Sequence, residues 1–148
     1  MGAHTNSMIT GIRAELSSLK VTRDKVVKFK ALLAQAIETR DQASGVMEKY
    51  YTAKGWNGQK AGREHEMDTD QAYAGLVAKW EAAWVVVNNR AKDVKICTDA
   101  ASVFSKRALK LVQELEGYVK KKEAEKFWWQ KKSVTASKQF IDYAKAVI

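Results

Sequence analysis

Two short stretches of the sequence concentrate cationic side chains. Residues 20–30, "KVTRDKVVKFK", and residues 120–132, "KKKEAEKFWWQKK", each carry a net charge of +4, so together they hold +8 of the formal net charge of +9. Clustered lysines and arginines neutralise phosphates and release the counterions around them. The sequence therefore predicts contact with a polyanion through Lys20, Arg23, Lys25, Lys28, Lys30, Lys120, Lys121, Lys122, Lys126, Trp128, Lys131 and Lys132.

Aromatic residues interrupt the second of these stretches. Phe127, Trp128 and Trp129 lie among the lysines, and nucleic-acid bases stack on exposed rings of this kind. Tryptophan beside lysine also suits an anionic membrane surface. Successive residues of a helix lie about 100° apart, so the three rings cannot all face one core. Exposure of Phe127 or Trp128 would favour binding, whereas burial of both would leave only a helix end.

Residues suited to catalysis are sparse in this chain. His65 lies in the acidic stretch "REHEMDTD", but alternate residues of a helix point to different faces, so these side chains would not converge on a metal ion. Cys97 is the only cysteine, and its apolar neighbours favour an inert thiol. There is no glycine-rich phosphate loop and no nucleophile elbow. We therefore predict no enzymatic activity, no metal site and no cofactor.

The elements that would position the basic side chains are predicted to be helices. Apolar residues recur at steps of three, four and seven from Ile12 to Tyr51, a period typical of an amphipathic helix. We expect a helix over residues 8–53, roughly 65–70 Å long, after a frayed terminus at residues 1–7. Gly45 makes a bend near residues 40–45 plausible.

The clearest break in the helical pattern is "AKGWNGQKAG", residues 53–62. Asparagine followed by glycine readily adopts positive φ, which predicts the turn of a helical hairpin. Asp68 or Thr69 is expected to cap the next helix, and the pattern allows that helix to begin at Gly58 or at Asp68.

Residues 69–119 continue the apolar pattern as one helix or two. Asn88 and Asn89 weaken a helix without forbidding it, and Thr98 or Asp99 could cap a new helix near residues 95–99. We expect Trp80 and Trp84 in the core or at an interface. After the basic segment 120–132, a C-terminal helix over residues 133–148, with Ser133 as a candidate cap, is predicted to bury a stripe that includes Phe140 and Tyr143.

Composition agrees with this helical pattern. The 148 residues contain no proline and only 8 glycines, and 46% are hydrophobic, so turn residues are scarce and long helices are favoured. We predict an all-α fold, an elongated bundle of three or four long amphipathic helices in a single domain, residues 1–148. No apolar run is long enough for a transmembrane helix. A cytoplasmic, virion-associated or nucleoid-associated location is expected, and secretion without a cleavable signal stays open.

Trp56, Asn57 and Gly58 lie between the two predicted long helices. This arrangement resembles the W-x-G family of secreted helical hairpins over residues 10–95. The resemblance implies export through a specialised secretion system and pairing as helical dimers. The chain departs from that family in its basicity and at "YVKKKE", where Glu123 lies one place too far from Tyr118 for the usual acidic signal.

These observations predict a non-enzymatic, basic helical binding protein that contacts nucleic acid without sequence specificity, or another polyanion. The alternative is a structural or protein–protein interaction bundle, including the W-x-G-like hairpin, and the third choice is binding to a membrane surface. The long stripes also predict a homo-oligomer or a helical protein partner.

Overall fold

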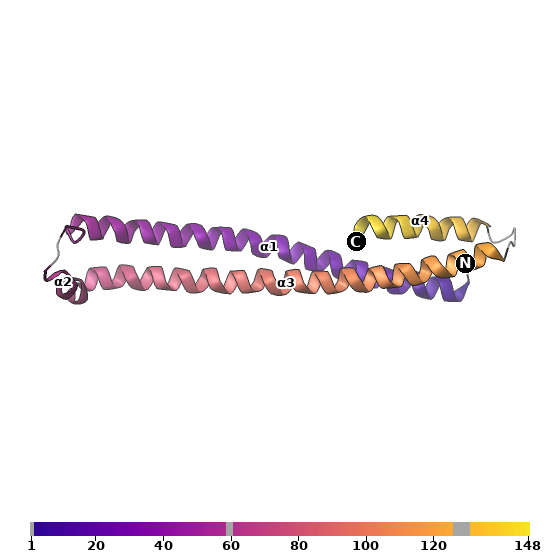
Figure 1. Cartoon of the computed structure of the whole chain (residues 1–148), viewed down its shortest axis with the longest axis horizontal. Helices are drawn as coiled ribbons and strands as arrows, with labels where there is room; N and C mark the ends of the chain where they lie inside the picture. The colour runs from indigo at the N-terminus through magenta and orange to yellow at the C-terminus, as the bar shows by residue number, and fades with distance from the viewer. Residues whose placement is uncertain (1, 59–60, 126–130) are drawn as a thin grey trace. The chain divides into compact units, whose positions relative to one another are not determined.

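The computed structural model describes residues 2–58, 61–125 and 131–148. The described residues form four helices and no strand (Figure 1). Helix α1 spans Ala3–Ala53, the short α2 spans Arg63–Thr69, α3 spans Gln71–Ala124 and α4 spans Lys131–Val147. The two long helices pack against each other, which confirms the predicted all-α bundle.

The chain divides into two compact units, which we describe separately. The terminal unit comprises Met1–Lys25 and Ile96–Ile148, and the hairpin unit comprises Val26–Lys95. Both α1 and α3 continue through the two units, so the division does not test the prediction of a single domain.

The terminal unit has a continuous apolar core. It is built from one face each of α1, α3 and α4, and its buried residues are spaced by three or four along each helix, which is the helical period. They are Ile9, Ile12, Leu16 and Leu19 on α1, Ala108, Val112, Leu115 and Val119 on α3, and Ile141 and Ala144 on α4. Each large side chain buried here contributes about 1.5–3 kcal/mol to folding.

Helix α1 begins at Ala3, where the sequence predicted a frayed segment over residues 1–7. Thr5 is buried, and the rings of His4 and Tyr118 pack edge to face with their centroids 4.9 Å apart. These contacts with α3 extend the helix to its first residues, a tertiary stabilisation that a local pattern does not carry.

The hairpin unit has a smaller core. Ala36 of α1 and Ala83 and Val87 of α3 are buried between the two helices, which run antiparallel in this unit (Figure 1). Small side chains at these positions let the helices approach closely. Asn88 and Asn89 are both exposed, so their amides face water. Helix α3 runs through them and through residues 95–99, where the sequence left a break open.

The turn of the hairpin ends α1 with a Schellman motif. The Trp56 N–H donates to the carbonyl of Tyr51, and the Gly55 N–H donates to the carbonyl of Thr52 at 2.9 Å. Gly55 has φ +72°, the left-handed conformation that this motif requires and that glycine adopts without a steric penalty. The turn therefore lies inside the predicted segment 53–62.

Trp56 is the largest fully buried side chain among the described residues, with 1% of its surface exposed. Its indole N–H donates to Glu66 Oε2 at 2.8 Å, and its ring packs against the rings of Tyr50, Tyr51 and Tyr73 at centroid distances of 5.1–5.9 Å. The tryptophan thus ties α2 to both long helices at the turn.

Asp70 caps α3, one or two residues after the predicted Asp68 or Thr69. Its carboxylate accepts the N–H of Tyr73 at 2.9 Å and the hydroxyl of Tyr50 at 2.7 Å. These two hydrogen bonds, with Lys54 at 3.7 Å, hold the pKa of Asp70 below its ordinary value. The separate helix α2, which the pattern did not resolve, moves the cap to this position.

Trp84 was predicted to lie in the core or at an interface, and it is not a core residue. Its side chain is 38% exposed, and the Arg40 guanidinium lies 4.4 Å from its ring centre. Ala83 and Val87 occupy the core positions, so Trp84, about 100° from Ala83, lies at the edge of the interface. There a cation–π contact covers one face of the ring.

Candidate functional site

A groove of about 950 Å³ lies between α1 and α4 on the terminal unit. Helix α1 lines it with Arg13, Leu16, Ser17, Lys20, Arg23 and Asp24. Helix α4 lines it with Ala136, Gln139, Phe140, Tyr143 and Val147. Within each helix these positions recur at steps of three and four, so each wall is one side of a helix adjoining its core face.

The groove carries an excess of positive charge. Three cationic residues line it, Arg13, Lys20 and Arg23, together with one carboxylate residue, Asp24. The whole terminal unit holds 15 lysines and arginines against 8 aspartates and glutamates, a net +7 of the formal +9. An anionic ligand would therefore meet a favourable potential at this unit.

Arg23 also has a structural role in the groove. Its guanidinium donates hydrogen bonds to the backbone oxygens of Val147 and Ile148, the second at 2.6 Å. A cation at a helix C-terminus satisfies carbonyls that have no partner within the helix and complements the helix dipole. Because guanidinium has five N–H donors, Arg23 keeps further donors for a ligand.

Aromatic side chains form the α4 wall. The Arg13 guanidinium lies 5.3 Å from the ring centre of Phe140, and the rings of Phe140 and Tyr143 are 6.1 Å apart. Phe140 is half-buried, whereas Tyr143 is 59% exposed. The prediction that Tyr143 joins a buried stripe is therefore wrong, and the groove combines an exposed ring with cations.

The first basic stretch is divided between the two units. Lys20 and Arg23 line the groove, and Lys25 lies in the terminal unit outside it. Lys28 and Lys30 are exposed on α1 in the hairpin unit. The groove therefore gathers only part of the predicted set.

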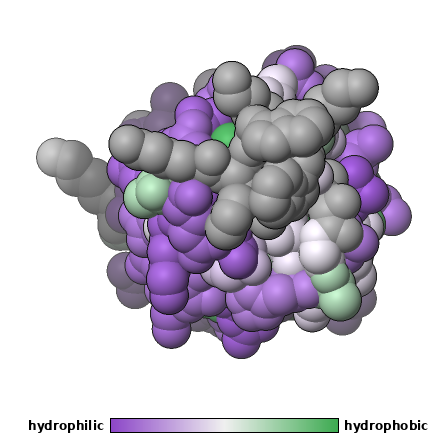
Figure 2. Space-filling view, turned by 90° about the vertical axis from the view of Figure 1, so that its right-hand side faces the viewer, coloured by the Kyte–Doolittle hydropathy of each residue, from purple (hydrophilic) through white to green (hydrophobic). Residues whose placement is uncertain are grey.

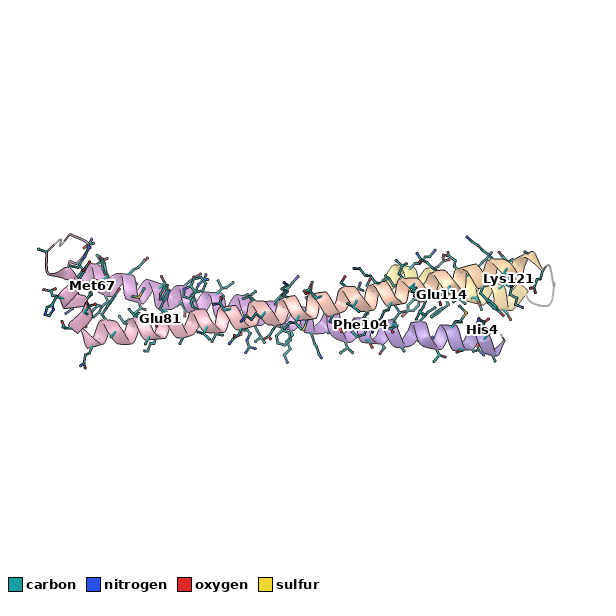
Figure 3. All side chains as sticks on the ribbon, turned by 60° about the horizontal axis from the view of Figure 1, so that its bottom comes forward. His4, Met67, Glu81, Phe104, Glu114 and Lys121 are labelled. Atoms are coloured by element: carbon teal, nitrogen blue, oxygen red, sulfur yellow. The ribbon has the colours of Figure 1, made fainter. Side chains whose placement is uncertain are left out.

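The second basic stretch begins at the far end of the terminal unit. Lys120, Lys121 and Lys122 end α3 close to His4, and Figure 3 labels His4 and Lys121 at this same end. Figure 2 looks onto this end and shows mostly hydrophilic residues around the grey ones. Lys126, Phe127, Trp128 and Trp129 lie outside the described residues, and so do the side chains of Lys131 and Lys132, which begin α4.

Acidic neighbours offset part of the charge at this end. Lys122 pairs with Glu125 at 3.5 Å and lies 5.5 Å from the ring centre of Tyr118. The hydrogen bond from Lys145 and the nearby charge of Lys120 lower the pKa of Glu116. Lys138 pairs with Glu123. Lys121 makes no ion pair within the described part of the chain.

Within the described part of the terminal unit, the lysines of the two basic stretches lie apart. Lys20 lies 16 residues beyond His4 on α1, a separation of roughly 24 Å at 1.5 Å per residue, and His4 marks the end where Lys120–Lys122 lie. A ligand that touched both would have to span most of the terminal unit.

Other kinds of site find little support in the geometry. In residues 2–58, 61–125 and 131–148, no cluster of three or more histidine, cysteine, aspartate or glutamate side chains could hold a metal ion. Within the same ranges, no helix combines the length and the apolarity needed to cross a membrane.

The sequence pattern did not indicate three of the groove residues as candidate site residues, namely Arg13, Phe140 and Tyr143. Arg13 lies outside both basic stretches, but it precedes Lys20 by seven residues, a spacing that places both on one side of a helix. The seven-residue spacing from Lys20 could therefore have indicated Arg13 as a site residue. No family model, curated protein or solved structure matches this chain.

Proposed function

We propose that this chain is a non-enzymatic binding protein whose terminal unit contacts nucleic acid without sequence specificity. The observation that carries the proposal is the groove, whose lining combines three cationic residues and one carboxylate residue with the exposed ring of Tyr143. Cations dispersed along a helix suit the phosphate backbone, which carries no sequence information.

Salt dependence tests this proposal. Three groove cations predict that log affinity falls against log salt with a slope of about −2 on a single strand and about −3 on a duplex. Further contacts from Lys120–Lys122 would steepen the slope. A flat salt dependence, or no binding at low salt, would contradict the proposal.

A matched pair of double variants locates the contacts. Arg13→Gln with Lys20→Gln removes two charges from the groove, and Lys106→Gln with Lys110→Gln removes two exposed charges from α3 in the same unit. We expect the first pair to weaken binding and flatten the slope by about 1.4 on a single strand. The second double variant, on α3, should weaken binding less. If both double variants weaken binding equally, net charge alone determines the affinity.

A protein partner is the second candidate. Ile96 and Val103, one heptad apart on α3 in the terminal unit, are 66% and 47% exposed. Residues at this spacing share a helix side and could contact another helix. Sedimentation of the purified protein across concentration tests self-association, and replacing both residues with serine should reduce it.

A further inference from the structure

Tyr143 is an exposed aromatic residue on a helix that has an apolar core side. Among the α4 side chains that the structure describes, those of residues 133–147, the buried ones are Ser137, Ile141 and Ala144, and they recur at steps of four and three. Tyr143 and Phe140 each precede one of them by a single residue, about 100° around the helix. Both rings therefore lie on the side that faces the groove, and Tyr143 presents 59% of its surface to solvent.

The cations are placed on the opposite wall from this ring. The α1 wall of the groove carries Arg13, Lys20 and Arg23, and the α4 wall carries Tyr143. Lys20 and Arg23 are three residues apart, roughly 4.5 Å along the helix, and Arg13 lies roughly 10 Å before Lys20. A ligand in the groove would meet positive charge along one wall and an aromatic face on the other.

These two walls match the two chemical parts of a nucleotide strand. Phosphates are contacted by cationic side chains, and bases stack on aromatic rings with little regard to sequence. In a duplex the base faces are already stacked on their neighbours, so a ring at the surface cannot reach them without unstacking the base. The cations serve either form of nucleic acid, whereas the ring serves only an unpaired base.

We infer that the groove binds single-stranded nucleic acid, with a base stacked on Tyr143 and the adjoining phosphates held by Arg13, Lys20 and Arg23. This inference rests on the proposed function and narrows its ligand to the single-stranded class. Arg23, fixed by its hydrogen bonds to the backbone oxygens of Val147 and Ile148, holds the end of α4 against α1 and so keeps the two walls in register.

The test compares three proteins by fluorescence anisotropy: wild type, Tyr143→Ala and Tyr143→Phe. The probes are a labelled oligothymidylate of about 16 nucleotides, within the usual site size, and a duplex of the same length at the same salt. Wild type should bind the single strand more tightly than the duplex. Tyr143→Ala should lose roughly 5- to 100-fold in affinity for the single strand and leave duplex affinity unchanged, whereas Tyr143→Phe should keep single-strand affinity.

Two controls separate stacking from charge and from folding. Inorganic polyphosphate carries charge but no base, so its affinity should be the same for wild type and Tyr143→Ala. Trp84→Ala removes another exposed ring, outside the groove, and should leave single-strand affinity unchanged. Because Tyr143 is exposed, its replacement should leave the thermal unfolding midpoint close to that of wild type.

The outcomes distinguish this inference from the proposed function. Equal affinity for single strand and duplex, or no loss in Tyr143→Ala, would overturn the single-strand inference while salt-dependent binding still supported a polyanion partner. Equal losses for polyphosphate and for the single strand in Tyr143→Ala would also overturn it, because stacking would not explain them. No binding of any probe at low salt would overturn both.

Discussion

Asp70 shows how one side chain joins several elements of the hairpin unit. Its carboxylate caps α3 through the Tyr73 N–H, accepts the Tyr50 hydroxyl from α1 and lies near Lys54. The hydrogen bond from the Tyr50 hydroxyl to Asp70 also raises the pKa of Tyr50. A negative charge at this point also complements the N-terminal end of the α3 dipole. Ionised Asp70 is therefore favoured by the folded state.

We predict that Asp70→Asn lowers the stability of the protein at neutral pH. Because the folded-state pKa of Asp70 lies below its unfolded value, its contribution is fully present above the unfolded pKa and is lost as pH falls through the folded pKa. The difference between wild type and Asp70→Asn should therefore shrink below about pH 4. Urea unfolding midpoints measured from pH 3 to 8 would check this.

Asp68→Asn is the matched control for that experiment. Asp68 is exposed on α2 and makes no ion pair among the described residues, so its replacement should change the midpoint little at any pH. Equal losses in the two variants would indicate that general charge, rather than the contacts of Asp70, produces the pH dependence.

The candidate site could be predicted only in part from single residues. Lys20 and Arg23 stand out because they belong to a dense basic stretch. Arg13 is isolated in sequence and becomes a site residue only because α4 packs beside it. Tyr143 fits an apolar helical stripe, but Ile141 and Ala144 fill the core, so its exposure depends on how α4 is rotated, which the spacing left open.

At the scale of elements, the helices were more predictable than their ends. Apolar periodicity predicted α1 and the C-terminal helix, and the glycines predicted the hairpin turn. Helix α3 spans Asn88 and Asn89 because both side chains face water. The start of α1 depends on tertiary contacts of His4 and Thr5, which no local pattern specifies.

Two glycines of the hairpin unit should respond oppositely to the same substitution. Gly55 has φ +72°, and an added Cβ there would meet no atom within 4 Å, so Gly55→Ala carries a backbone penalty of about 1–2 kcal/mol. Gly75 lies inside α3, also with open space around an added Cβ. Gly75→Ala should stabilise the helix by about 0.5–1 kcal/mol.

Chemical unfolding of both variants measures this contrast. Because each adds one methyl group in open space, a difference in sign would isolate backbone conformation from packing. A stabilised Gly55→Ala protein would contradict the Schellman assignment at the end of α1. A destabilised Gly75→Ala protein would indicate that α3 needs flexibility at that point.

At the scale of the whole molecule, the distribution of charge separates the two units. The terminal unit carries +7, and the hairpin unit carries 11 lysines and arginines against 9 aspartates and glutamates, a net +2. The basic stretches are visible in the sequence, but their spacing does not predict that Lys20 and Arg23 lie at one end of the terminal unit and Lys120–Lys122 at the other. That separation follows from the antiparallel pairing of α1 with α3, in which His4 meets Tyr118.

The separation predicts that ligand length decides which lysines take part. At about 3.4 Å per stacked nucleotide, a strand of about 4 nucleotides covers roughly 14 Å, which is about the length of α1 from Arg13 to Arg23. A strand of this length that occupies the groove cannot also reach Lys120 and Lys121 at the far end of the terminal unit. A strand of about 16 nucleotides can. Replacing Lys120 and Lys121 with glutamine should therefore leave affinity for the short strand unchanged and flatten the salt slope for the long strand by about 1.4.

The groove variant supplies the comparison. Arg13→Gln with Lys20→Gln should weaken binding of both lengths, because the groove engages even a short strand. If one long strand contacts both ends, the slope changes of the two double variants should add in the quadruple variant, since the sites are well separated. If replacing Lys120 and Lys121 leaves the salt slope for the long strand unchanged, these lysines belong to a solvated helix end. Binding would then be confined to the groove between α1 and α4.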